Sequence, residues 1–143
     1  MAKEVKTAEA RWVEGLEFEG TTGSEHRLTL DAAVNGGGKN HGPSPMELLL
    51  LGLAGCTGMD VIDILKKKRQ SVSGLQVRVE GIRAEHPPKV YTDIQVTYFV
   101  RGKNISPKAV EDAIELSETK YCGAGIMLGK TAKITSHYEI VQE

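Results

Sequence analysis

The stretch Ser44-Pro-Met-Glu-Leu-Leu-Leu-Leu-Gly-Leu-Ala-Gly-Cys-Thr-Gly58 decides the fold of this 143-residue chain. Ser44 suits the N-cap of a helix, Pro45 suits its first turn, and Glu47 stands three residues after the cap, as a capping box requires. A basic cluster at residues 66–69 suits the carboxyl end of the same helix, where positive charge offsets the helix dipole. We therefore expect a helix that begins near residue 45 and ends at this cluster.

This helix is apolar on every side from residue 48 to residue 54, so either protein or lipid has to surround it. The uncharged run ends at residue 59, which makes it too short for the ~20 residues that a membrane span needs. Asp60 and Asp63 follow at once. We therefore expect a long helix buried inside the protein, and no membrane partner.

Two cysteines carry the chemistry that the sequence offers. Cys56 lies in the glycine-rich part of the helix, and Cys122 lies in Lys120-Tyr-Cys-Gly-Ala-Gly125. A free cysteine is often only a small buried hydrophobe, and this structural role is one interpretation of the pair. In the other interpretation, a thiolate attacks a peroxide oxygen, and the second thiol closes a disulfide and releases water. Asp60 is expected to oppose ionisation of Cys56, whereas Lys120 is expected to favour ionisation of Cys122.

The rest of the chain predicts a single α+β domain over residues 1–143, because this length and a hydrophobic content of 40% suit one core. A second Ser-Pro pair at residues 106–107 predicts a shorter helix that ends near Lys120. Alternating apolar residues predict strands at 5–13, 16–19 and 26–32, a hairpin of 75–80 with 90–100, and a last strand at 134–140. The expected order is βββ-α-ββ-α-β.

Composition and spacing disfavour several kinds of function. A net charge of −1 gives no electrostatic basis for binding nucleic acid. The first residues do not show a basic start followed by an apolar leader, so we expect a cytoplasmic protein. The four histidines share no ligand spacing with each other or with the cysteines, so no metal site is expected. Residues 124–131 fit a relaxed phosphate-loop pattern without the long α/β domain that a nucleotide site needs. The glycine run at residues 35–39 predicts a flexible loop.

Three features together resemble the OsmC/Ohr family of organic-hydroperoxide reductases. They are Ser44-Pro-Met-Glu-Leu-Leu, the following Gly55-Cys56-Thr57, and a hairpin, helix and Tyr121-Cys122 leading into a last strand. The likeness covers nearly the whole chain. The amino-acid sequence of these motifs is most similar to that of an uncharacterised branch of OsmC-like proteins.

The resemblance implies an intertwined homodimer in which two antiparallel sheets enclose the central helices. It implies that Cys56 attacks the hydroperoxide to give a sulfenic acid, and that Cys122 resolves it into a disulfide. Dithiols, including protein-bound lipoyl groups, are the implied reductants. Glu47 stands one position after the family's active-site glutamate, which leaves it two roles, catalytic residue or helix cap. Leu16 aligns with the family's supporting arginine, with Arg11 and Arg27 as alternatives.

Two functions of different class follow. The first is a thiol-dependent peroxidase that reduces small apolar organic hydroperoxides through Cys56 and Cys122 without a cofactor. The second is a dimeric binding or carrier protein that keeps the fold and its apolar pocket without efficient turnover.

Overall fold

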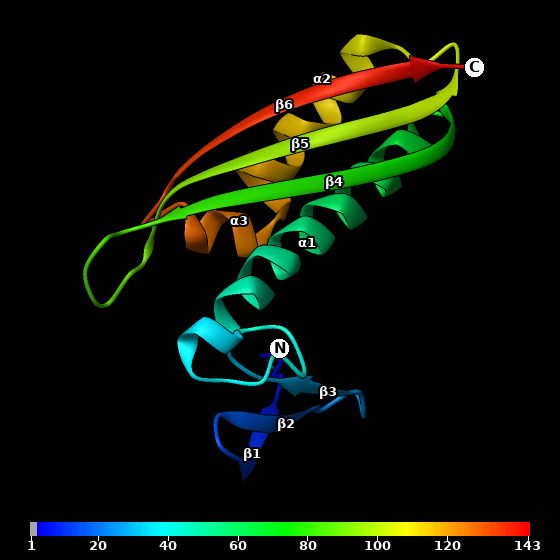
Figure 1. Cartoon of the computed structure of the whole chain (residues 1–143). Coiled ribbons are helices and arrows are strands. Elements are labelled where there is room, and N and C mark those ends of the chain that lie inside the picture. Colours follow the sequence, from blue (N-terminus) through cyan, green and yellow to red (C-terminus); the bar gives the residue numbers. More distant parts are fainter. Residues whose placement is uncertain (1–2) are drawn as a thin grey trace. The chain divides into compact units, whose positions relative to one another are not determined.

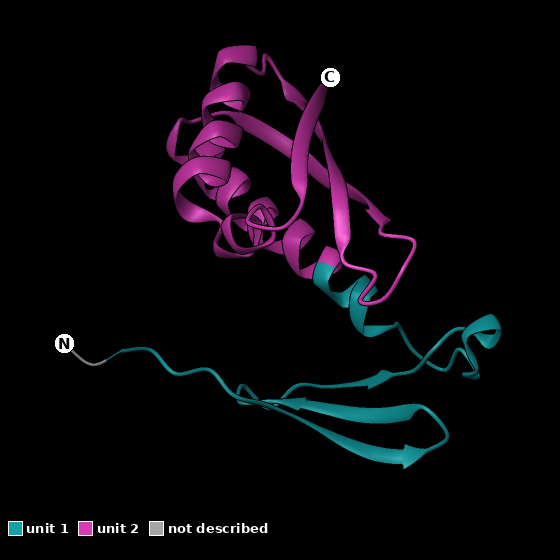
Figure 2. Cartoon of the chain, turned by 90° about the vertical axis from the view of Figure 1, so that its left-hand side faces the viewer, with its two compact units in different colours: residues 1–49 teal, residues 50–143 magenta. Residues whose placement is uncertain are grey.

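The chain forms two compact units in a computed structural model that describes residues 3–143. The first unit extends to Leu49, and the second comprises Leu50–Glu143 (Figure 2). Each unit contains its own three-stranded sheet. The expectation of a single domain stays a prediction.

The first unit is an antiparallel meander of β1 (Ala8–Glu14), β2 (Glu17–Thr22) and β3 (Arg27–Leu30). Its strands pair in the order β1-β2-β3, as the alternating pattern predicted. The first connection is tight because Gly15 adopts a positive φ of 54°, a conformation that favours glycine. A short 3-10 turn, Val34–Gly36, follows the sheet.

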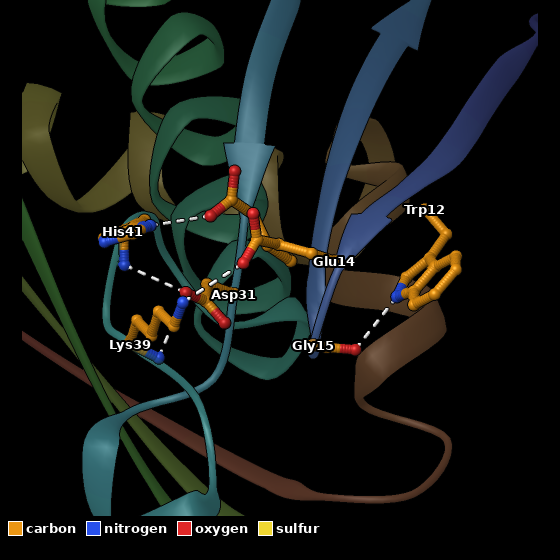
Figure 3. Close-up of polar contacts among 7 residues, drawn as sticks. Trp12, Glu14, Gly15, Asp31, Lys39 and His41 are labelled. Atoms are coloured by element: carbon orange, nitrogen blue, oxygen red, sulfur yellow. Dashed lines mark hydrogen bonds and ion pairs between the residues drawn. The ribbon is translucent and has the colours of Figure 1, made fainter.

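The loop after β3 is closed by one buried carboxylate. Asp31 Oδ1 accepts a hydrogen bond from the Ala32 amide at 2.7 Å. Its Oδ2 accepts from the amides of Lys39 at 3.2 Å and His41 at 3.1 Å (Figure 3). A Cβ atom at Gly38 would overlap the Ala32 carbonyl, so the loop also needs glycine there. The glycine run is therefore part of a pinned loop, and the prediction of a flexible one gives way to this geometry.

Helix α1 spans Pro45–Lys67, as the sequence predicted. The capping box is formed: the Ser44 amide donates to Glu47 Oε1 at 2.9 Å, and the Glu47 amide donates to Ser44 Oγ at 3.3 Å. Lys66 and Lys67 occupy the last turn, where their charge suits the helix dipole.

The second sheet consists of β4 (Ser71–Arg83), β5 (Tyr91–Lys103) and β6 (Lys133–Gln142), in that order. β4 and β5 form the predicted antiparallel hairpin. β6 runs parallel to β5, so the expectation of purely antiparallel sheets is wrong for this pair. The physical reason is the long crossover between them through α2 (Pro107–Leu116) and α3 (Gly123–Leu128), because a return over the sheet face brings the chain back in the same direction.

All three helices lie on one face of the second sheet (Figure 1). The side of α1 that is buried consists of residues four apart, Leu53, Thr57, Val61 and Leu65. Other apolar residues of α1 are exposed in the single chain: Leu51 is 65% and Met59 73% accessible. The expectation of an all-round buried helix is thus met on one side only, because one sheet covers only one side of a helix.

Helix α1 is also long and apolar enough to cross a membrane by length and composition, with a mean hydropathy of 1.8 over its best window. Core helices of soluble proteins pass the same test, and the face from Leu53 to Leu65 is buried in protein here.

Candidate active site

The structure brings the two cysteines together. Cys56 lies about three turns into α1 and is half-buried, whereas Cys122 is fully buried at the start of α3. Both thiols are free, and Cys56 lies close enough to Cys122 to add to the rise in the pKa of the Cys122 thiol. The sequence predicted this approach, which a disulfide between the two residues requires.

Backbone contacts fix the sulfur of Cys122. Its side chain caps α3 by accepting a hydrogen bond from the Gly125 amide at 3.2 Å, and its own amide donates to the Ser117 carbonyl at 2.8 Å. Ser117 begins a π-helical turn, Ser117–Tyr121, which joins α2 to Cys122. A Cβ atom at position 125 would lie 3.3 Å from the Cys122 sulfur and 3.4 Å from Leu53 Cδ1, so glycine lets the helix approach the thiol.

Burial raises the pKa of Cys122 to about 11. The Gly125 amide acts in the opposite direction, but the neighbouring Cys56 thiol and the Asp60 carboxylate add to the rise. The expectation that Lys120 favours ionisation of Cys122 is therefore wrong. The Lys120 ammonium lies 5.3 Å from the centre of the Tyr121 ring, and desolvation dominates at the sulfur.

Cys122 forms part of the wall of a cavity of about 500 Å³ within the second unit. Polar groups enter this cavity from Tyr98 and Glu118. The remaining wall is mainly aliphatic and glycine, with two lysines at the α3–β6 connection. The lining residues besides these are Leu53, Thr57, Val96, Gly125, Ile126, Gly129, Lys130, Ala132, Lys133 and Ile134.

A chain of buried polar side chains runs beside the cysteines. Thr57 Oγ1 lies 2.8 Å from the Tyr98 hydroxyl and 2.7 Å from Ser117 Oγ. The Tyr98 hydroxyl donates to Glu118 Oε2 at 3.0 Å, and Ser117 Oγ donates to Asp60 Oδ2, also at 3.0 Å. Burial raises the pKa of Tyr98, so its hydroxyl keeps its proton. Sequence reasoning missed this chain because its members come from three separate elements.

Glu47 is placed in the capping box. Its Oε1 accepts from both the amide and the hydroxyl of Ser44, and these two bonds hold the pKa of the carboxyl below its usual value. It precedes Cys56 by nine residues, about two and a half helical turns. Of the three predicted site residues, the structure thus places Cys56 and Cys122 near each other and holds Glu47 in the helix cap.

A second polar cluster in the first unit was also missed. The carboxylates of Glu17 and Asp31 and the imidazole of His41 offer ligand atoms within 4.8 Å of one another, a spacing open to a metal ion. His41 Nδ1 already lies 2.6 Å from Glu17 Oε1, and Asp31 accepts three amide hydrogen bonds. These bonds explain the cluster as a clamp on its loop. The three residues are 14 and 10 positions apart in the sequence, and this spacing gives no sign of the cluster.

Comparison with known proteins supports one family. Residues 36–137 match the family model described as OsmC-like protein. Protein YhfA of Escherichia coli is 40% identical over 134 residues, which cover 94% of this chain and 97% of YhfA.

Solved structures agree with this match. A hypothetical protein from Aquifex aeolicus is 33% identical, with a TM-score of 0.87 and 99% of each chain covered. The organic hydroperoxide resistance protein OsmC of Legionella pneumophila shares the fold at 15% identity, with a TM-score of 0.73 and 97% and 99% of the two chains covered. With the thiol pair, the fold and the family model in agreement, this chain belongs to the OsmC-like protein family.

Proposed function

We propose that the protein reduces small apolar organic hydroperoxides with its two thiols. The observation that carries this proposal is the pair of free, neighbouring thiols Cys56 and Cys122, the second of which lines a cavity of about 500 Å³ with a largely aliphatic wall. The fold that this chain shares with a hydroperoxide resistance protein supports it.

The reaction uses each sulfur once. The Cys56 thiolate attacks one peroxide oxygen, the O–O bond breaks, and the bonding electron pair leaves with the alkoxide, which takes up a proton to become an alcohol. Cys56 is then a sulfenic acid. The Cys122 sulfur displaces its hydroxyl, which leaves as water with the Cys122 proton, and a disulfide forms. An external dithiol, such as a lipoyl group, returns both thiols by disulfide exchange.

The difference in environment between the two thiols supports these roles. Cys122 is fully buried, and its pKa of about 11 keeps it protonated at neutral pH. Cys56 is half-buried and accessible to an entering oxidant. A protonated, buried thiol suits the second step, in which the electrophile is the adjacent Cys56 sulfenic acid.

Single-turnover oxidation tests the assignment. One equivalent of cumene hydroperoxide is expected to produce a disulfide in the native protein, and a Cys56 sulfenic acid in Cys122→Ser. Cys56→Ser is expected to consume no peroxide. Mass spectrometry reads out the products, and turnover with a dithiol against a monothiol identifies the class of reductant. Oxidation confined to Cys122, or at neither cysteine, would remove Cys56 as the nucleophile.

The alternative function is a binding or carrier protein. The observation in its favour is the high pKa of Cys122 beside an open cavity, which suits ligand binding as well as slow thiol chemistry. A carrier would bind apolar alcohols at the cavity while neither thiol is consumed by peroxide. The single-turnover experiment separates the two.

We further propose that the protein is a cytoplasmic homodimer, without nucleic acid or membrane as a partner. The exposed apolar side chains of α1, such as Leu51 and Met59, support the dimer because water-facing residues of this size favour a covered surface. Sedimentation at micromolar concentration tests it, and a stable monomer would contradict it.

A further inference from the structure

The buried polar chain between Asp60 and Glu118 contains more oxygen contacts than hydroxyl protons. Four contacts link the two carboxylates through Ser117, Thr57 and Tyr98, but these three hydroxyls carry three protons. Tyr98 donates to Glu118 and Ser117 donates to Asp60. Thr57 then has one proton for its two contacts, although both are short.

A contact without a proton would be costly at this place. Thr57 is 1% accessible, and Tyr98 and Ser117 are fully buried. Two hydroxyl oxygens 2.7 or 2.8 Å apart, with no hydrogen between them, repel each other. A fourth proton on either carboxyl removes the conflict, because all four contacts are then hydrogen bonds in a single direction.

We propose that this chain holds one mobile proton, shared between the Asp60 and Glu118 carboxyls, and that it donates this proton inside the thiol cavity. When Glu118 carries the proton, the bonds run from Glu118 through Tyr98, Thr57 and Ser117 to Asp60. When Asp60 carries it, all four bonds run in the opposite direction. Transfer from one end to the other therefore needs only a proton shift along each contact.

The two ends of the chain reach different cavities. Glu118 lines the cavity that contains Cys122, whereas Asp60 lines a separate one of about 420 Å³ between α1 and the π-helical turn. Ser136 also donates to Glu118 Oε1, at 3.1 Å, and so leaves the other oxygen to the chain. The other titratable residues that line the cavity at Asp60 are Asp63, Lys67, Lys68 and Tyr121. Glu118 shares the cavity of Cys122 with Lys130 and Lys133. It also lines a third cavity, together with Glu111, Glu115, His137 and Tyr138.

The role of this proton rests on the proposed peroxidase function. Attack of the Cys56 thiolate on a hydroperoxide breaks the O–O bond and leaves an alkoxide, which needs one proton. Glu118, which lines the same cavity as Cys122, supplies it as a general acid, and the chain refills Glu118 from Asp60. Thr57, Tyr98 and Ser117 act as positioning residues that connect the two carboxyls.

Infrared spectroscopy tests the proton itself, without any turnover. At neutral pH the reduced protein is expected to show the carbonyl stretch of one protonated carboxyl, which shifts in D₂O. Thr57→Val alters no carboxyl, yet the signal should vanish, because the two remaining contacts need only the protons of Tyr98 and Ser117. Thr57→Ser keeps the hydroxyl and should keep the signal.

Tyr98→Phe provides a second route, since it leaves two contacts for the protons of Thr57 and Ser117, and the signal should vanish there too. A native spectrum without a protonated carboxyl, or a signal that persists in both Thr57→Val and Tyr98→Phe, overturns the proposal. Neither outcome depends on peroxide reduction. In the kinetic assay, Thr57→Val should slow oxidation of Cys56 by cumene hydroperoxide about 100-fold relative to Thr57→Ser, the scale of a general acid; equal rates would overturn the catalytic role.

Discussion

The two units satisfy their buried polar groups in different ways. In the first unit, the Asp31 carboxylate accepts three backbone amide hydrogen bonds, from Ala32, Lys39 and His41. In the second unit, Thr57, Tyr98 and Ser117 bond mainly to one another and to two carboxylates. Throughout residues 3–143, no fully buried side-chain nitrogen or oxygen lacks a hydrogen-bond partner.

This difference separates a structural device from a chemical one. A backbone amide always donates, so three amides fix Asp31 as an ionised acceptor and the loop as one conformation. A hydroxyl donates or accepts, so a chain of hydroxyls can reverse its direction. The first arrangement holds a loop closed, whereas the second can pass a proton.

Asp31→Ala is expected to have the largest effect on stability. It removes the one acceptor that three amides of the pinned loop share, so the loop loses all three hydrogen bonds that hold its ends together. Differential scanning calorimetry should show the largest fall in thermal midpoint among these variants. An unchanged midpoint would mean that the loop does not depend on the carboxylate.

Asp31→Asn is the matched control, because one of its two side-chain oxygens becomes a donor, and it should fall between the native protein and Asp31→Ala. Hydrogen bonds from the backbone amides of His41, Ala32 and Lys39 hold the pKa of Asp31 below its reference value of 3.8. The contribution of Asp31 to the folding stability is therefore fully present above pH 3.8. It is lost as the pH falls through the lower pKa that Asp31 has in the folded protein. Asp31→Asn should remove that part of the acid denaturation.

Thr57→Val is expected to cost less, about 1–2 kcal/mol of unfolding free energy, because it removes two hydrogen bonds but lets Tyr98 and Ser117 keep their carboxylate acceptors. Thr57→Ser should cost under about 1.5 kcal/mol, for the loss of one buried methyl group. Urea unfolding measures both. A loss of stability in Thr57→Val as large as that in Asp31→Ala would indicate that the polar chain from Asp60 to Glu118 is a structural clamp, like the Asp31 carboxylate.

Cys122 should add a smaller, alkaline effect. Burial raises its pKa from 9.0 to about 11, so the folded state favours the neutral thiol. The resulting stability is present below pH 9.0 and is lost as the pH rises toward about 11. Cys122→Ala, compared with the native protein under reducing conditions, should flatten the alkaline fall in thermal midpoint within this interval. A fall of equal steepness in both proteins would contradict burial as the cause.

Glu47 should show the smallest effect. Glu47→Ala removes the capping box and is expected to cost about 1 kcal/mol or less, whereas Glu47→Gln can keep the bonds to Ser44. Peroxide consumption then separates the two roles left open for this residue. A stable Glu47→Gln that loses activity would make Glu47 catalytic, and unchanged activity would make it a cap.

Local patterns in the sequence predicted the parts of the fold that depend on neighbours along the chain. The capping box, α1, the meander and the β4–β5 hairpin follow from spacing of this kind. The approach of Cys56 to Cys122 was expected from the glycines around Cys56 and from the family resemblance. The direction of β6, the Asp31 clamp and the chain from Asp60 to Glu118 depend on residues far apart in sequence, and nothing in their spacing indicates that they meet.

The parallel pairing of β5 and β6 has a consequence for the order of folding. The hairpin of β4 and β5 closes over a short connection, whereas Asp93 meets Lys133 only after the whole α2–α3 crossover has been ordered. Such long-range pairing loses chain entropy before it gains contacts, so β6 should dock late and limit the folding rate. Because Lys133 and Ile134 line the thiol cavity, an intermediate without β6 would expose Cys122 to solvent. During folding, a thiol that is fully buried in the native second unit would thus be open to oxidants in solution.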